Sequence, residues 1–161
     1  MKKTLLSMMT MAILASGSAN AVDMDINVTA EIPHKVNMIP QSAGVDLSNA
    51  KLAADPNDDS KYMYTQAVTL KGNGNKSVNV RAKNALQLRH NTDNQSTLPI
   101  NVVTLGGENI QTGASITAGG QDFVLTNGTT DIVLKIVADK SPSTTTGTYE
   151  GVLALELSET P

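Results

Sequence analysis

Residues 22–32 alternate strictly between apolar and polar side chains, the clearest pattern in this chain. The apolar positions are Val22, Met24, Ile26, Val28, Ala30 and Ile32, and the positions between them are all polar. Because successive side chains of a β-strand point to opposite faces, the alternation predicts a strand with one apolar and one polar face. Pro33 ends this strand, since proline cannot donate a hydrogen bond to a neighbouring strand.

The rest of the chain predicts further short strands separated by turns. We expect a short strand at 36–38, and longer ones at Tyr62–Lys71, Ser77–Ala82, Leu98–Leu105, Asp131–Asp139 and Thr148–Ser158. Gly72–Asn75 and Asn127–Gly128 carry strong turn signals. Residues 45–54 fit either a short strand or a helical turn. No stretch shows a convincing helical period, so the pattern predicts an all-β sandwich.

Residues 1–21 have the composition of a secretory signal peptide. Lys2 and Lys3 precede an apolar centre, and Ala19-Asn20-Ala21 forms a small-x-small cleavage site. The apolar centre is too short for a membrane span, so an uncleaved anchor is the less favoured interpretation. The expected organisation is therefore a signal peptide at 1–21, an N-terminal strand at 22–33 and one β domain at 34–161. Such an amphipathic strand at a free end needs a sheet to join, its own or another molecule's.

Composition narrows the function further. Cleavage after residue 21 would remove Lys2 and Lys3 and change the net charge from −3 to −5, and no basic tract is present, so a nucleic-acid partner is not expected. The absence of cysteine excludes thiol catalysis and cysteine metal sites. With three tyrosines, one phenylalanine and no tryptophan, the chain has few aromatic rings for a ligand pocket.

Candidate catalytic or metal-binding residues are sparse. His34 and His90 are isolated in sequence, and we expect both to be surface residues. The acidic stretch 55–60 lacks the order of a calcium-binding EF-hand loop and is expected to be a solvated loop. Neither a nucleophile elbow nor a phosphate-binding loop occurs. The sequence therefore predicts no catalytic residues, no metal and no cofactor, and no enzyme, although paired carboxylates on the sandwich leave a hydrolase as a remote alternative.

Three segments, in order along the chain, resemble one protein family. Asp25–Ala30 is similar to the mature N-terminus of major pilins of the colonisation factor antigen I group. Leu98–Val102 resembles a Pro-x-x-Val strand of that family, and Gly147–Leu155 resembles its Gly-x-Tyr-x-Gly final strand. These pilins build the class 5, or alpha, fimbriae of the alternate chaperone–usher pathway. Residues 45–60 and 106–120 match no segment of the family that we can place.

The resemblance implies an incomplete immunoglobulin-like sandwich that is completed by a donated N-terminal strand. The donor face would be Val22, Met24, Ile26, Val28, Ala30 and Ile32, by addition of a strand to an exposed sheet edge. The acceptor groove would be lined by Val36, Met38, Leu153, Leu155 and Leu157. Implied partners are further copies of the chain, a periplasmic pilus chaperone, an outer-membrane usher and a tip adhesin, with a host-cell receptor as an additional candidate. The chain would pass through the periplasm into a cell-surface fimbria.

One alternative from a different class remains open from the sequence. A soluble exported β-sandwich binding module could pair its N-terminal strand within its own sheet. Its alternation would look the same as that of a donor strand, but the module would stay monomeric. Polymerisation therefore separates the two interpretations.

Overall fold

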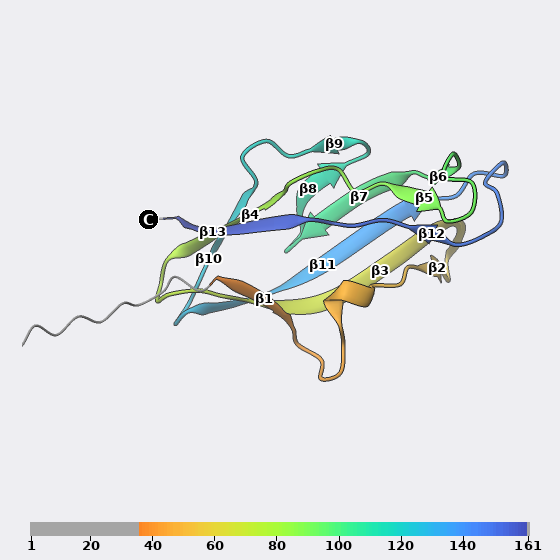
Figure 1. The fold of residues 1–161 in the computed structure, drawn as a ribbon. Coiled ribbons are helices and arrows are strands. Elements are labelled where there is room, and N and C mark those ends of the chain that lie inside the picture. Colours follow the sequence, from red (N-terminus) through yellow and green to blue (C-terminus); the bar gives the residue numbers. More distant parts are fainter. Residues whose placement is uncertain (1–35, 161) are drawn as a thin grey trace, which may run out of the picture. The chain divides into compact units, whose positions relative to one another are not determined.

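The computed structural model describes residues 36–160, which belong to one compact unit spanning 33–161 (Figure 1). Strands dominate it, and its one described helix is the single 3-10 turn η1 (Leu47–Asn49). Among these residues no helix is long and apolar enough to cross a membrane. The predicted all-β fold is confirmed. Residues 45–54, left open between strand and helical turn, contain both η1 and the strand β2 (Ala53–Asp55).

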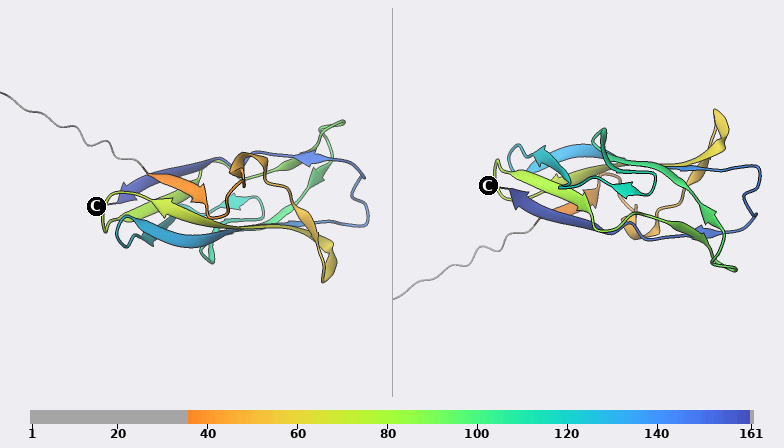
Figure 2. Two further views of the ribbon diagram at one scale, coloured as in Figure 1. Left: turned by 90° about the horizontal axis from the view of Figure 1, so that it is seen from below. Right: turned by 90° about the horizontal axis from the view of Figure 1, so that it is seen from above.

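The strands form one large sheet and two small ones (Figures 1 and 2). The large sheet has the order β1 (Asn37–Pro40), β3 (Asp58–Lys71), β11 (Thr129–Asp139), β7 (Ile100–Leu105), β8 (Glu108–Thr112), β9 (Ser115–Ile116), with β2 added to β3. The second sheet has the order β10 (Gln121–Val124), β4 (Ser77–Ala82), β13 (Leu155–Thr160). The third has the order β12 (Tyr149–Glu150), β5 (Leu88–His90), β6 (Thr97–Leu98).

Two long antiparallel strands are the centre of the large sheet. β3 and β11 pair continuously from Lys71 with Thr129 to Lys61 with Asp139. The turn before β11 uses Asn127 and Gly128, whose φ angles of 53° and 81° fit the primed turns of tight hairpins. The turn between β3 and β4 lies at 72–76, and Gly74 has a φ of 66°. Both predicted turns are therefore confirmed.

Inward side chains of the sheets share one apolar core. Its fully buried members include Val68 and Leu70 of β3, Val78 and Val80 of β4, and Leu105 of β7. The side views in Figure 2 show the sheets as the layers of a sandwich, which accounts for a common core between them. On β11, Ile136 faces this core while Val133 on the other face is 43% exposed, so only part of that strand is buried on both sides.

Some predicted boundaries were wrong for local reasons. The acidic stretch 55–60 is not a loop throughout, because β2 and β3 pair across a two-residue turn at Pro56–Asn57. The Asp55 carboxylate accepts from the Asn57 N–H, which holds this turn. On β3, the Ser60 hydroxyl and then Lys61 lower the pKa of Asp58 to about 2. Within residues 36–160 no group of three potential ligand side chains could hold a metal ion.

The predicted final strand Thr148–Ser158 is divided. β12 pairs with β5 and β13 pairs with β4, while residues 151–154 between them pair with no strand. Gly151 lies directly against the Gln87 carbonyl, where a Cβ atom would overlap the backbone. The chain thus changes its partner sheet at Gly151. This contact is between segments far apart in sequence, and the alternation of residues 148–158 alone does not report it.

Gln111 of β8 is a fully buried polar residue that bonds to the segment between β4 and β5. Its Oε1 accepts from the Leu86 N–H at 2.7 Å, and its Nε2 donates to the carbonyl oxygens of Leu86 at 3.1 Å and Gly113 at 2.7 Å. These bonds satisfy backbone groups of a segment that lacks a strand partner.

Replacing this amide tests its structural role. We expect Gln111→Leu to lower the free energy of unfolding by about 2–4 kcal/mol, because buried backbone groups lose their partners. Gln95→Leu, at an exposed position in the 91–96 loop, is the control, with an expected change below about 0.5 kcal/mol. Urea unfolding followed by circular dichroism measures both. Equal stability of the two variants would contradict the role given to Gln111.

Candidate functional site

Among the strands that end a sheet in the described part of the chain, β1 and β13 each leave one edge unpaired and carry apolar side chains that pack against the core. Within residues 36–160, β1 pairs only with β3, and β13 pairs only with β4. An unpaired edge presents a row of backbone donors and acceptors to which another strand can bind. β1 and β13 are the first and last described strands of the chain, as Figure 1 shows. We call their unpaired edges, with the side chains beside them, the seam.

The pairing fixes the direction of these two strands. Asn37, where β1 begins, lies opposite Lys71, and Thr160, where β13 ends, lies opposite Ser77. Lys71 and Ser77 flank the turn at 72–76, so β1 begins and β13 ends at this one end of the sandwich, the turn end. The opposite end, the hairpin end, carries the Pro56–Asn57 turn before β3. β1 and β13 therefore run in opposite directions.

All five side chains predicted to line the acceptor groove lie along the seam. Met38 of β1 pairs with the buried Leu70, and Leu155 and Leu157 of β13 pair with Ala82 and Val80. Val36 precedes β1 and Leu153 precedes β13. Each of the five is half-buried and packs against the common core. Their partners across the pairs, by contrast, are almost fully buried. The core is thus less completely covered along this seam.

The predicted donor face cannot be placed in the same way. Val22, Met24, Ile26, Val28, Ala30 and Ile32 lie outside the described residues, as does His34. The structure therefore describes the edge to which a strand could be added, and the sequence alone describes the strand. A donor role for 22–32 remains a prediction.

Sequence reasoning missed a second group of half-buried apolar side chains. Leu47, Leu52, Tyr62 and Tyr64 also pack against the core. Tyr62 and Tyr64 alternate with the rest of β3, but no local pattern indicates that β1 covers only part of that strand's edge. β1 pairs with β3 from Val68 to Lys71, and β2 pairs with it again only up to Met63. The edge of β3 between these points has no paired strand among the described residues.

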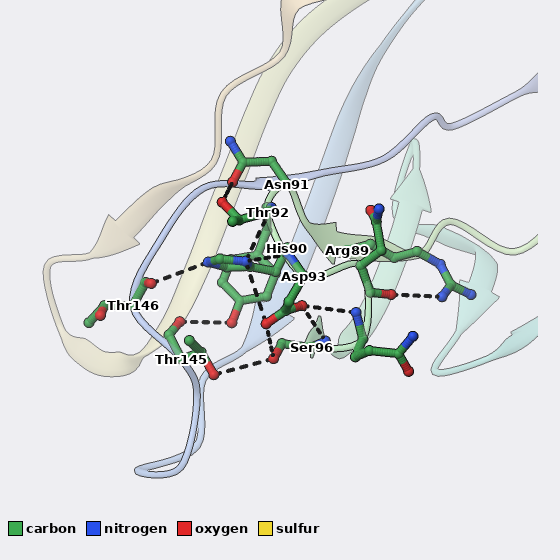
Figure 3. Close-up of polar contacts among 11 residues, drawn as sticks. Arg89, His90, Asn91, Thr92, Asp93, Ser96, Thr145 and Thr146 are labelled. Carbon is green, nitrogen blue, oxygen red and sulfur yellow. Dashed lines mark hydrogen bonds and ion pairs between the residues drawn. The ribbon is translucent and has the colours of Figure 1, made fainter.

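His90 is buried, so the prediction of a surface histidine was wrong for this residue. Figure 3 shows its polar contacts. It shares the inward face of β5 with Leu88, and its ring packs edge-on against Tyr149. Gly147 makes room for the ring, since a Cβ atom there would overlap it. The ring is held by backbone groups: Nε2 lies 3.2 Å from the Thr146 oxygen, and Nδ1 accepts from two N–H groups of the 92–93 turn.

The neighbouring loop is closed by Asp93. Its carboxylate accepts from the N–H groups of Ser96 and Gln95, and these bonds lower the pKa of Asp93. The Tyr149 hydroxyl donates to the Thr145 carbonyl at 2.7 Å, which resembles the tyrosine corner of immunoglobulin-like sandwiches. Both ring nitrogens of His90 already have partners, so the cluster in Figure 3 has the form of a structural corner.

Comparison with known proteins agrees with this geometry. Residues 22–158 match the family described as CS1 type fimbrial major subunit. The solved structure of the CooA pilin subunit from enterotoxigenic Escherichia coli is similar to this chain, with a TM-score of 0.60 and 16% sequence identity. That likeness covers 79% of this chain and 88% of the CooA chain, and it concerns the fold. A comparison with curated protein sequences finds no match.

Proposed function

The chain belongs to the family of CS1 type fimbrial major subunits, and from this membership we propose that it polymerises by donating residues 22–32 to the next copy of itself. It is a structural pilin subunit of a cell-surface fimbria, as predicted from the sequence. The observation that carries the proposal is the pair of unpaired edges on β1 and β13, with half-buried apolar side chains between them and the core. The self-complemented soluble module is not favoured by the family.

The strand directions restrict how a donated strand can enter the seam. The donor segment precedes β1, so it leaves its own subunit from the turn end. If it entered the next copy antiparallel to β1, its last residues would lie at the turn end of that copy, and two turn ends would meet. Each subunit would then need both neighbours at one end, which prevents a linear fibre.

Insertion parallel to β1 and antiparallel to β13 avoids this conflict. The end of the donated strand then lies at the hairpin end of the acceptor, where the turn end of the donor follows. Every subunit uses opposite ends for its two neighbours, and a heterologous contact of this kind generates an open filament. The proposed interface consists of ladder hydrogen bonds to the unpaired edges, with the alternate apolar side chains of 22–32 filling the spaces along the seam.

Further partners follow from this mode of assembly. Before polymerisation, the seam would be covered by a periplasmic chaperone, because an exposed apolar edge invites aggregation. An outer-membrane usher would then exchange the chaperone for the donated strand, and a tip adhesin would terminate the fibre. A host-cell receptor is a further candidate partner of the assembled fibre. The proposed route begins with export of residues 1–161 and removal of 1–21, and it requires no metal or cofactor.

The exported chain tests the proposal directly. Electron microscopy of surface material from cells that express the chain with its assembly proteins should show fibres. N-terminal sequencing of these fibres should begin at Val22. A cleavage site downstream of Ile32 in fibres of normal stability would overturn the donor role, because the strand would then be missing.

A further inference from the structure

We propose that Tyr64 forms the floor of a shallow pocket that accepts Ala30 of the donated strand and rejects a larger side chain. This size match fixes the register in which the strand enters the seam. The inference rests on the proposed strand donation. It adds a specificity-determining position to β3 that lies beyond the acceptor residues predicted from the sequence.

The first support is length. The alternating stretch 22–32 has eleven residues and spans about 33 Å as a strand, whereas the four residues of β1 span about 10 Å. Most of a donated strand must therefore lie beyond Pro40. Among the described residues, the edge of β3 has no paired strand in this region, between Val68, which pairs with Pro40, and Met63, which pairs with Ala53. Its one backbone bond there, within the same residues, is from the Gln41 N–H to the Ala67 carbonyl.

The second support is the row of side chains along that open edge. Tyr64 has the same parity along β3 as the core residues Val68 and Leu70, and it packs against the same core. Leu52, just before β2, is half-buried there as well, and so is Leu153 before β13. The apolar lining thus continues past β1 toward the hairpin end, with a bulky ring in place of an aliphatic side chain.

Counting along β3 gives the register. Met38 pairs with Leu70, so Val36 comes level with Gly72. The stretch from Gly72 back to Tyr62 contains eleven residues, the same number as the donor stretch 22–32. A strand parallel to β1 that begins with Val22 at the level of Gly72 brings Ala30 to Tyr64. Ala30 is the smallest of the six apolar donor residues, and it comes level with Tyr64. Tyr64 is as bulky as Tyr62 at the end of the row and differs from it in its buried hydroxyl, which is unpaired within residues 36–160.

The Tyr64 hydroxyl provides an independent sign of a missing partner. Its oxygen is buried and has no hydrogen-bond partner among the described residues. Buried tyrosine hydroxyls are normally bonded. Past Pro40, β1 no longer separates the donated strand from β3, so the backbone N–H and C=O groups of that strand come near this position. The donated strand can therefore supply the partner that the isolated subunit lacks.

A size exchange in assembled fibres tests the pocket. Ala30→Leu should lower the temperature at which fibres dissociate in detergent by about 10 °C or more, because the added atoms overfill the space at the ring. Combining Ala30→Leu with Tyr64→Ala should restore the dissociation temperature above that of either single variant. Thr29→Leu, on the opposite face of the donor strand, is the matched control and should leave fibres unchanged. Tyr64→Leu replaces Tyr64→Ala if circular dichroism shows that the alanine variant does not fold.

Each result decides the inference separately from strand donation itself. The proposed pocket would be overturned if Ala30→Leu fibres had parental stability, or if the double variant did not improve on both single variants. The Ile26→Asp variant tests strand donation in the same assay, because the role of Ile26 does not depend on Tyr64. If Ile26→Asp fibres also form normally, the proposed function fails; if only the size exchange fails, the register alone is wrong.

Discussion

The Ile26→Asp variant is expected to accumulate as unpolymerised subunit, whereas Asn27→Asp is expected to form normal fibres. Ile26 lies in the middle of the apolar face of 22–32, and Asn27 lies on its polar face. Burying one large aliphatic side chain contributes about 1.5–3 kcal/mol, and the five large donor residues together contribute about 8–15 kcal/mol as an upper bound. A carboxylate in the seam removes one such contribution and adds the cost of burying an unpaired charge.

Comparing the two variants separates the effect of the strand face from the effect of the added charge. Each variant adds one negative charge, at adjacent positions, so a general effect of charge on export would change both alike. Electron microscopy and unheated detergent gels measure the amount and length of polymer. Fibres from Ile26→Asp in parental amounts would contradict the donor role of this face, and loss of fibres from both variants would assign the effect to charge.

Leu157→Asp should block the other half of the contact. Leu157 faces the core from β13 beside the seam, so a carboxylate there should prevent a strand from being accepted. Its own residues 22–32 remain intact, and it should still donate. Co-expression of Leu157→Asp with Ile26→Asp should therefore yield dimers and no longer species, because one chain only donates and the other only accepts.

The dimer is the informative product, since loss of polymer alone could reflect misfolding of Leu157→Asp. Size-exclusion chromatography with light scattering determines the mass of the complex. Ser158→Asp, at an exposed position next along β13, is the matched control and should polymerise. Long fibres from the co-expressed pair would show that Leu157 is not required for acceptance. A complete absence of dimers, with both chains folded, would contradict the division into donor and acceptor surfaces.

Those parts of the fold that depend on neighbouring residues could be predicted from the sequence. The alternation in β3 and β11 and the Asn127–Gly128 turn are local signals, and the structure has them where they were expected. The acceptor residues followed from the family resemblance, and alternation contributed only that Leu153, Leu155 and Leu157 share one face of the last segment. Their half-burial agrees with the predicted position, and their role in binding remains a prediction.

Other features depend on contacts between distant segments and left no local signal. His90 reads as part of a polar loop, yet it is buried because Gly147, far along the chain, leaves space for its ring. The break in the last strand follows from the approach of Gly151 to Gln87. Tyr64 has the pattern of an ordinary strand residue, and its position beside an uncovered stretch of β3 appears only when the short pairing of β1 with β3 is known.

Transfer of the strand within one chain tests the central claim most directly. Residues 22–32 are deleted from the N-terminus and attached after Pro161 through a flexible linker, so that the strand can enter the seam of its own subunit. The account predicts that the deleted chain is unstable or aggregates, and that the transferred strand rescues it as a monomer with a much higher melting temperature. A deleted chain that melts like the intact one, with no gain from the transferred strand, would contradict the incomplete sandwich and leave residues 22–32 as a tail.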